Sequence, residues 1–421
     1  MTNPQAARIF YGWRVVAAAF LNLFFVVGII FYGFPVFYPA FIESLRFTRS
    51  QVTQGFFLGM LIVGLPSGLL AGGLIDRIGA RWVILTGVGL TGVSLLLMGS
   101  MTRFWHYELL CIMEVLGFVL AGPIANQVLV ARWFRKLRGR AMGYAYLGLG
   151  LGGVVAPPLM TFLIQAFGWR HALEIVGLLI LLVLFPVGIW ITRSNPAELG
   201  LLPDGARLPE EKSGVASNAA IAVAAAVRSK NFWLIVVGSA LVVGAIGAVI
   251  QHFILFLRDQ GFSRSVASQF LSVLLASSLA GRVLVGYMAD RFSKKNIMAL
   301  FYLLIGGAVL LLGVAHGPVA LWIFTVAFGF SMGADYMLIP LVVAECFGTA
   351  SLGKLLALII MGYSLGQWGA PWMVGRIFDA EHSYDLAWRI MAVGALVGAG
   401  AVYAVSNASR ESQCLPNRVD E

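Results

Sequence analysis

The chain has 421 residues and a formal net charge of +10, with 60% apolar and 11% charged residues. A soluble protein of this length would leave much of that apolar surface in water, so the composition excludes a soluble domain and predicts an integral membrane protein. Anionic lipid headgroups suffice to balance the positive charge, so membrane lipids are expected partners and nucleic acid is not.

Twelve segments are apolar over the roughly 20 residues that a helix needs to cross the hydrocarbon. They lie at about 13–37, 52–75, 82–100, 104–128, 140–163, 171–192, 231–256, 262–289, 296–315, 319–345, 354–378 and 386–406. Most connections between them are short. We therefore expect an all-α membrane protein with twelve transmembrane helices.

The basic residues set the expected orientation. They gather in loops on one side, above all between the fourth and fifth spans at Arg132, Arg135, Lys136, Arg138 and Arg140. The positive-inside rule then predicts a multi-pass protein with both termini in the cytoplasm, in a plasma membrane such as the bacterial inner membrane.

An internal repeat divides the chain. At one constant offset, Gly72, Asp76 and Arg77 return as Gly286, Asp290 and Arg291, and Gly148, Gly152 and Pro157 return as Gly362, Gly366 and Pro371. We expect an N-terminal six-helix bundle over 1–192, a cytoplasmic linker over 193–230, and a C-terminal six-helix bundle with a short tail over 231–421. Two parallel repeats around a central site are typical of transporters, in which one half rocks against the other.

Several motifs then resemble a known family. The run from Gly72 to Arg81, GGLIDRIGAR, resembles the signature loop of the major facilitator superfamily. Further runs are similar to bacterial monocarboxylate transporter-like and oxalate/formate antiporter-like members: Tyr11-Gly12-Trp13, Arg132-Trp133-Phe134, Arg138-Gly139, Gly168-Trp169-Arg170, residues 196–205 and Gly333-Ala334-Asp335. The resemblance extends from about residue 8 to 406. It implies a major facilitator fold and secondary transport of a small organic anion, by symport or antiport.

Two charges within the spans are the main site candidates. Arg282 interrupts an otherwise apolar or small stretch, and a cation at membrane depth marks a functional site by default. At about 1.5 Å per helical residue, Asp335 in the tenth span lies at a similar depth. The functional hypothesis makes Arg282 the anion ligand and Asp335 its switchable, proton-coupling partner. The alternatives are a fixed salt bridge, or an Asp335 that faces the cytoplasmic gate.

The resemblance also bears on the size of the anion. Related carriers place a second cation in the first or eleventh span, yet this chain has Ile30 and Phe31 in the first and Gly362 and Tyr363 in the eleventh. One arginine fits a single carboxylate, or a larger amphipathic acid, better than a dicarboxylate.

Two more titratable groups lie within spans. Glu114 is a candidate proton carrier, or else a permanently protonated glutamic acid hydrogen-bonded between helices. His252 falls where the family often has histidine and is a candidate for proton coupling. A packing or hydrogen-bonding role is the alternative for His252.

Hydroxyl and amide side chains in the spans are candidates for orienting a substrate. The candidates include Tyr32, Asn126, Tyr336, Tyr363 and Gln367, of which Tyr336, Tyr363 and Gln367 are favoured. Tyr363 and Gln367 are one helical turn apart and share a face. Packing between helices or anchoring at the membrane interface is the alternative for each tyrosine.

Charged loop residues are expected to close the cytoplasmic gate when the site faces outward. They are Asp76, Arg77, Arg81, Asp290 and Arg291. No hydrolase triad, phosphate-binding glycine loop or metal cluster is evident, so we expect neither an enzyme nor a cofactor. We also expect a monomer that transports an organic anion with protons or in exchange for a counter-anion. The alternatives are a proton-driven exporter of hydrophobic compounds and a non-transporting membrane sensor.

Overall fold

The computed structural model describes residues 10–406 apart from 136, 206–218, 290, 315–316 and 348–351. It also leaves out some side chains within or beside the helices, at 67–72, 76, 205, 219–222, 286, 289, 314, 336–337 and 352–353. Helices and the turns that join them make up the described residues, which confirms the all-α prediction.

The first half of the chain forms the helices α1 to α8. Their bounds are α1 Gly12–Leu23, η1 Phe24–Tyr32, η2 Phe34–Phe37, α2 Tyr38–Leu45, α3 Arg49–Gly59, η3 Met60–Gly64, α4 Leu65–Ile78, α5 Ala80–Met98, α6 Phe104–Ala121, α7 Pro123–Trp133, α8 Arg138–Pro186, η4 Val187–Ile191, η5 Pro196–Leu199 and η6 Pro203–Gly205. The fourth predicted span is therefore two helices, because Gly122 adopts an extended conformation between α6 and α7. The fifth and sixth predicted spans are continuous in α8 except at Gly168, whose φ of 78° interrupts the helix.

The second half forms α9 to α15. Their bounds are α9 Ala219–Arg228, α10 Lys230–Asp259, α11 Arg264–Ala289, α12 Lys294–Val314, α13 Pro318–Phe347, α14 Leu352–Glu381 and α15 Asp385–Tyr403. Nine helical stretches among the described residues are long and apolar enough to span a membrane. One of them, Arg138–Ile191, covers two predicted spans.

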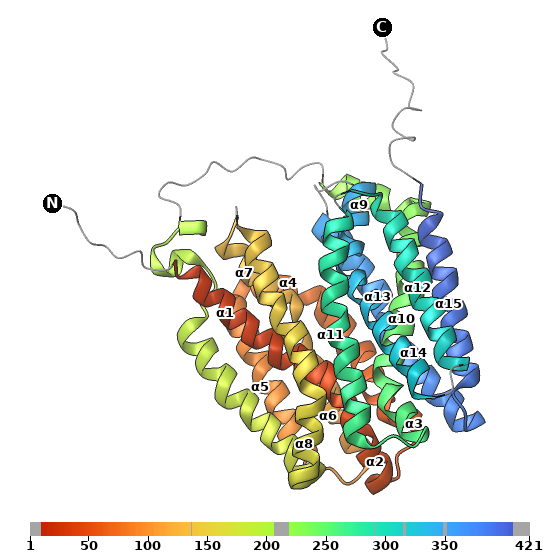
Figure 1. The fold of residues 1–421 in the computed structure, drawn as a ribbon. Coiled ribbons are helices and arrows are strands. Elements are labelled where there is room, and N and C mark those ends of the chain that lie inside the picture. Colours follow the sequence, from red (N-terminus) through yellow and green to blue (C-terminus); the bar gives the residue numbers. More distant parts are fainter. Residues whose placement is uncertain are drawn as a thin grey trace, which may run out of the picture. The chain divides into compact units, whose positions relative to one another are not determined.

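The chain divides into two compact units. Unit 1 contains 1–212 and 254–272, and unit 2 contains 213–253 and 273–421. In unit 1, α5 packs against α6 and α8, and α1 and η1 pack along α8. In unit 2, α12 lies beside α13 and α15 (Figure 1). Residues 254–272 follow the linker in sequence but belong to unit 1.

The repeated glycines bring helices together at equivalent places in each unit. A Cβ atom on Gly152 of α8 would lie 2.4 Å from the carbonyl oxygen of Phe24. A Cβ atom on Gly366 of α14 would lie 2.1 Å from the carbonyl oxygen of Ala240 on α10. Real Cβ atoms do not approach so closely, so only glycine allows this backbone approach. This packing explains why these glycines recur along the chain.

Candidate functional site

Glycines hold α11 and α13 in direct backbone contact within unit 2. A Cβ atom on Gly281 of α11 would lie 1.9 Å from the Phe330 carbonyl oxygen on α13. On the facing helix, a Cβ atom on Gly333 would lie 2.0 Å from the Ser278 carbonyl oxygen. The two contacts are about one turn apart on α11, so they fix the register of the pair.

This register determines where the two intramembrane charges lie. Arg282 directly follows Gly281 on α11, and Asp335 lies two residues after Gly333 on α13. Both therefore lie along the stretch where the two helices touch. Asp335 is buried, with 3% of its surface exposed, whereas Arg282 is half-buried. An arginine that keeps some exposure inside a span can meet a ligand.

The Asp335 carboxylate has a hydroxyl partner that sequence reasoning missed. The Tyr302 hydroxyl on α12 donates to Asp335 Oδ1 at 2.7 Å and lies 3.2 Å from Ser239 Oγ on α10. Tyr302 has one hydroxyl hydrogen, so when it donates to Asp335 the Ser239 hydroxyl must donate to Tyr302. In this conformation, no ion pair joins Asp335 to Arg282 among the described residues.

The remaining predicted substrate ligands lie on several helices. Tyr363 and Gln367 are half-buried on α14, one turn apart as expected. Tyr336 directly follows Asp335 in α13, but its side chain lies outside the described part. Tyr32 is buried at the end of η1 in unit 1, where its ring centroid lies 4.9 Å from that of Phe31. Their roles as ligands stay predictions.

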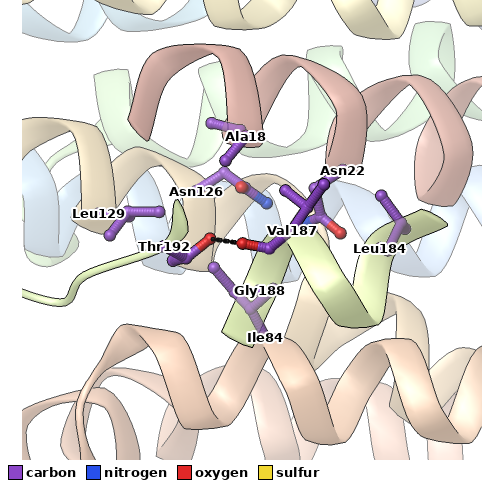
Figure 2. A pocket seen from close by; sticks show the side chains of 10 residues that line it. Ala18, Asn22, Ile84, Asn126, Leu129, Leu184, Val187, Gly188 and Thr192 are labelled. Atoms are coloured by element: carbon purple, nitrogen blue, oxygen red, sulfur yellow. Dashed lines mark hydrogen bonds between the residues drawn. The ribbon is translucent and has the colours of Figure 1, made fainter. Parts of the chain in front are cut away.

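Asn126 caps the break between α6 and α7. Its amide nitrogen donates to the carbonyl oxygens of Ala121 and Gly122, both at 2.8 Å, and the Asn22 amide nitrogen from α1 also donates to Ala121. Carbonyl oxygens can only accept, so both amide nitrogens must face the break. Figure 2 shows the two asparagines on the wall of a small cavity that Thr192 also lines. The pair therefore satisfies backbone groups that the interrupted helix leaves open.

We predict that this capping contributes measurably to stability. Asn126→Ala should lower the free energy of unfolding by about 1–2 kcal/mol, because it removes two buried hydrogen bonds from the Asn126 amide to the Ala121 and Gly122 carbonyls. Gln127→Ala is the matched control, since Gln127 is the exposed neighbouring amide on α7. Chemical denaturation in detergent measures both. Loss of anion affinity in Asn126→Ala at unchanged stability would instead support its sequence-predicted role as a ligand.

Glu114 lies in the tight packing of α5 and α6. It is fully buried and accepts a hydrogen bond from Ser94 of α5. Close by, a Cβ atom on Gly117 of α6 would lie 2.9 Å from the carbonyl oxygen of Gly87 on α5. This environment supports the interpretation of Glu114 as a glutamic acid hydrogen-bonded between helices. Its proton-carrier role stays a prediction.

His252 connects three elements of unit 2. Its Nε2 lies 2.8 Å from the Pro371 carbonyl oxygen on α14, and its Nδ1 lies 3.1 Å from the Tyr384 hydroxyl before α15. The carbonyl can only accept, so Nε2 carries a hydrogen; in the neutral form of the ring, Nδ1 then accepts from the Tyr384 hydroxyl. Both ring nitrogens of His252 therefore make hydrogen bonds, which favours the hydrogen-bonding role over proton coupling.

The predicted gating residues are distributed over both units. They are Asp76, Arg77, Arg81, Asp290 and Arg291. Arg77 and Arg81 lie at the facing ends of α4 and α5 in unit 1. Arg291 of unit 2 stacks over the Tyr287 ring, 4.2 Å from its centroid. Asp290 and the Asp76 side chain lie outside the described part. Their gating roles stay predictions.

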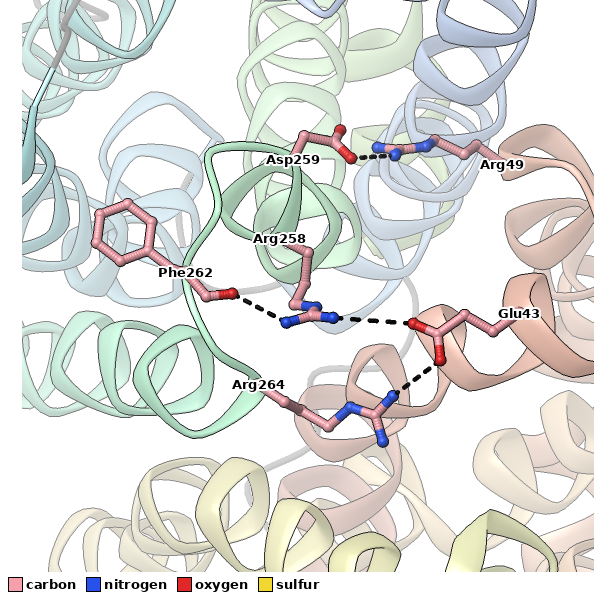
Figure 3. A network of polar contacts seen from close by, with 6 residues as sticks. All are labelled: Glu43, Arg49, Arg258, Asp259, Phe262 and Arg264. Atoms are coloured by element: carbon pink, nitrogen blue, oxygen red, sulfur yellow. Dashed lines mark hydrogen bonds and ion pairs between the residues drawn. The ribbon is translucent and has the colours of Figure 1, made fainter.

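A second charged network was not predicted from the sequence. Arg49 Nη2 lies 2.6 Å from Asp259 Oδ1. Glu43 forms ion pairs with Arg258 at 3.9 Å and with Arg264 at 3.5 Å (Figure 3). These residues come from α2, from the start of α3, and from the end of α10 and the start of α11, all within unit 1. By the predicted orientation, this outer ion network lies on the side opposite the gating loops.

We predict that the Arg49–Asp259 pair behaves as a true ion pair. Arg49→Asp places two carboxylates together and should destabilise this conformation, whereas Arg49→Asp with Asp259→Arg should restore it. The coupling should be about 0.2–1 kcal/mol, because both side chains are partly exposed, and salt should weaken it. A double-mutant cycle on thermal unfolding at low and high salt measures it. Additive effects of the two reversals would show that the pair contributes nothing.

Comparisons with known proteins agree with this architecture. The family model described as Major Facilitator Superfamily matches residues 20–371 and 259–417. Monocarboxylate transporter 13 of Bos taurus is 27% identical over 398 residues, which cover 93% of this chain and 88% of that protein. Monocarboxylate transporter 12 of Homo sapiens is 24% identical over 410 residues, which cover 90% of this chain and 77% of that protein.

A fungal protein and a solved structure extend the comparison. MFS-type transporter pytF of Aspergillus terreus is 27% identical over 290 residues, covering 68% of this chain and 91% of that protein. The crystal structure of a bacterial homolog of the human lysosomal transporter Spinster, inward-facing and unoccupied, matches with a TM-score of 0.70. It is 18% identical and the match covers 95% of both chains, which supports the fold. The chain therefore belongs to the major facilitator superfamily, whose members are transporters rather than enzymes.

Proposed function

We propose that this transporter moves a small organic anion, best a monocarboxylate, by alternating access. The observation that carries the proposal is Arg282, a half-buried guanidinium inside the membrane-spanning helix α11. Keeping a cation at that depth costs free energy, so its presence is explained if it binds an anion. A guanidinium also offers the planar pair of donors that a carboxylate accepts.

The number of cations favours a single carboxylate. The stretch of α14 that carries Tyr363 and Gln367 has no lysine or arginine between Lys354 and Arg376. A dicarboxylate held by Arg282 alone would bring a second, unpaired charge to membrane depth. Two relatives named monocarboxylate transporters, at 27% and 24% identity, support the same substrate class.

Asp335 supplies a route to proton coupling. It lies along the same α11–α13 contact as Arg282, and its negative charge opposes the entry of an anion there. Protonation of Asp335 removes that charge, so a proton and a carboxylate favour each other's binding. Exchange of one anion for another, without protons, is the other mode that the same site supports.

The outer ion network fits alternating access. In such a cycle the site opens to each side in turn, so contacts that close one end must break when that end opens. The pairs that Glu43 and Arg49 form with the end of α10 and the start of α11 are exposed enough to exchange with water. Weak pairs of this kind can be broken in every cycle at low cost.

Export of hydrophobic compounds is the second candidate, because Glu114 places a buried carboxyl group within a span. That function requires a wide, weakly charged cavity around a proton-carrying acid. Glu114 instead lies between the closely packed helices α5 and α6. Its surroundings therefore favour the anion transporter.

Uptake into sealed proteoliposomes tests the proposal. The purified protein should accumulate one or more monocarboxylates from a panel of labelled acids when the interior is made alkaline. Dicarboxylates of similar size and lipophilic cations should not accumulate. Transport of lipophilic cations with no response to any acid would replace the anion proposal by the exporter.

A further inference from the structure

A charged groove in unit 1 is separate from the Arg282 region. It lies where the α4–α5 turn, the end of α7 and the segment after η4 meet, and its volume is about 330 Å³. Arg77, Arg81, Arg132 and Glu198 supply its charges. We call it the arginine groove. Its volume lies within the range of small-molecule sites.

The charges of the arginine groove favour an anion. Three guanidiniums face one carboxylate along its walls. The carboxylate is also engaged, because Glu198 Oε1 accepts the backbone N–H of Asn195 at 3.1 Å. An anion carrying one or two negative charges would therefore complement the groove.

The groove is built on fixed backbone contacts. Arg81 donates from Nε to the Gly188 carbonyl at 3.1 Å and from Nη2 to the Ile189 carbonyl at 2.6 Å. Its backbone N–H donates to Ser194 Oγ at 3.1 Å. Gly79 allows this docking, because its φ is 87° and a Cβ atom would lie 2.7 Å from Ser194 Oγ. These contacts hold the wall of the groove in place before any ligand arrives.

The surroundings of the groove indicate the source of the anion. Trp82 lines it with 57% of its surface exposed, and Ile78 beside it is 48% exposed. Trp190, which follows the carbonyls that Arg81 binds, is 72% exposed. In a membrane protein, exposed tryptophan beside exposed aliphatic side chains marks the level of the headgroups. Acyl chains can then lie along the apolar side chains while a phosphate meets the arginines.

We propose that the arginine groove binds the phosphate of an anionic phospholipid headgroup, with Arg77 and Arg132 as ligands and Arg81 as their fixed neighbour. Lipid binding in this groove does not require the transported substrate. It lies on the predicted cytoplasmic side, where anionic lipid is enriched in many membranes.

The test titrates lipid into the purified full-length protein in detergent and follows thermal unfolding. Phosphatidylglycerol should stabilise the wild type saturably, and phosphatidylcholine should not. Arg132→Gln and Arg77→Gln should each weaken phosphatidylglycerol binding about tenfold, because each removes a charge-assisted contact. Arg103→Gln is the matched control, since it removes one exposed charge at the start of α6, away from the groove.

Several outcomes separate this site from general attraction to acidic lipid. Native mass spectrometry should retain one phosphatidylglycerol per wild-type chain and lose it in the Arg77→Gln/Arg132→Gln variant. If one of the single variants fails to fold, the other still tests the site, because each removes its own charge-assisted contact. Equal stabilisation by both lipids, or an equal loss in Arg103→Gln, would overturn the proposal. Equally tight binding of free glycerol phosphate would contradict the lipid as the source of the phosphate.

Discussion

Arg282→Ala should weaken monocarboxylate binding by roughly 10- to 100-fold while the protein still folds. A hydrogen bond to a charged group contributes about 1.5–3 kcal/mol, and each 1.4 kcal/mol is a factor of ten in affinity. Arg282→Lys keeps the charge but loses the planar pair of donors, so its affinity should lie between those of the wild type and the alanine variant. Binding is measured by the shift in thermal unfolding across an anion titration.

The control for this prediction is Arg389→Ala. Arg389 is an exposed arginine on α15 in the same unit, so its removal makes the same chemical change at the surface. Its anion affinity should equal that of the wild type. If Arg282→Ala transports the same anion with wild-type affinity, Arg282 is not the anion ligand.

Asp335→Asn should separate anion binding from pH. In the wild type, acid should tighten anion binding, because protonation of Asp335 and binding of the carboxylate favour each other by one coupling energy. Such couplings change affinity by roughly 5- to 150-fold. Asparagine imitates the protonated state, so the variant should bind tightly with little dependence on pH between about 5 and 8. It should lose uptake driven by a pH gradient and keep exchange.

The hydrogen bond from Tyr302 provides the control for Asp335. An asparagine oxygen still accepts from the Tyr302 hydroxyl, so the contact among α10, α12 and α13 survives the substitution. Tyr302→Phe removes the donor but keeps the carboxylate, so it should keep pH-dependent binding. A wild-type pH dependence in Asp335→Asn would move the proton site to Glu114 or His252. No pH dependence in the wild type would favour anion exchange without protons.

Much of the fold follows from the sequence because the bilayer imposes it. Spans must be long and apolar, and the repeated glycines mark where helices touch, as Gly152 and Gly366 show. The break at Gly122 was missed, although the Gly122-Pro123 dipeptide signals it. Apolar residues lie on both sides of the break, and Phe104–Trp133 is long and apolar enough to count as one span, so hydropathy alone does not reveal the broken helix.

The membrane depth of the two candidate charges could be predicted from the sequence, but the groups that their side chains contact could not. Counting residues along the helices put Arg282 and Asp335 at one level, and the Gly281 and Gly333 contacts agree. The partner of Asp335 was not predictable, because a helix that is apolar all round does not show which face carries Tyr302. The outer ion network was missed because Arg49 and Asp259 lie 210 residues apart, and no local pattern links them.

The most direct test of the central claim removes the charge from each partner in turn. The most strongly transported monocarboxylate and its uncharged amide are each titrated against the wild type and Arg282→Gln. If Arg282 binds the carboxylate, the wild type should prefer the acid over the amide by roughly 10- to 100-fold, and the variant should lose that preference. A preference for the acid that is equally large in both proteins would contradict the account.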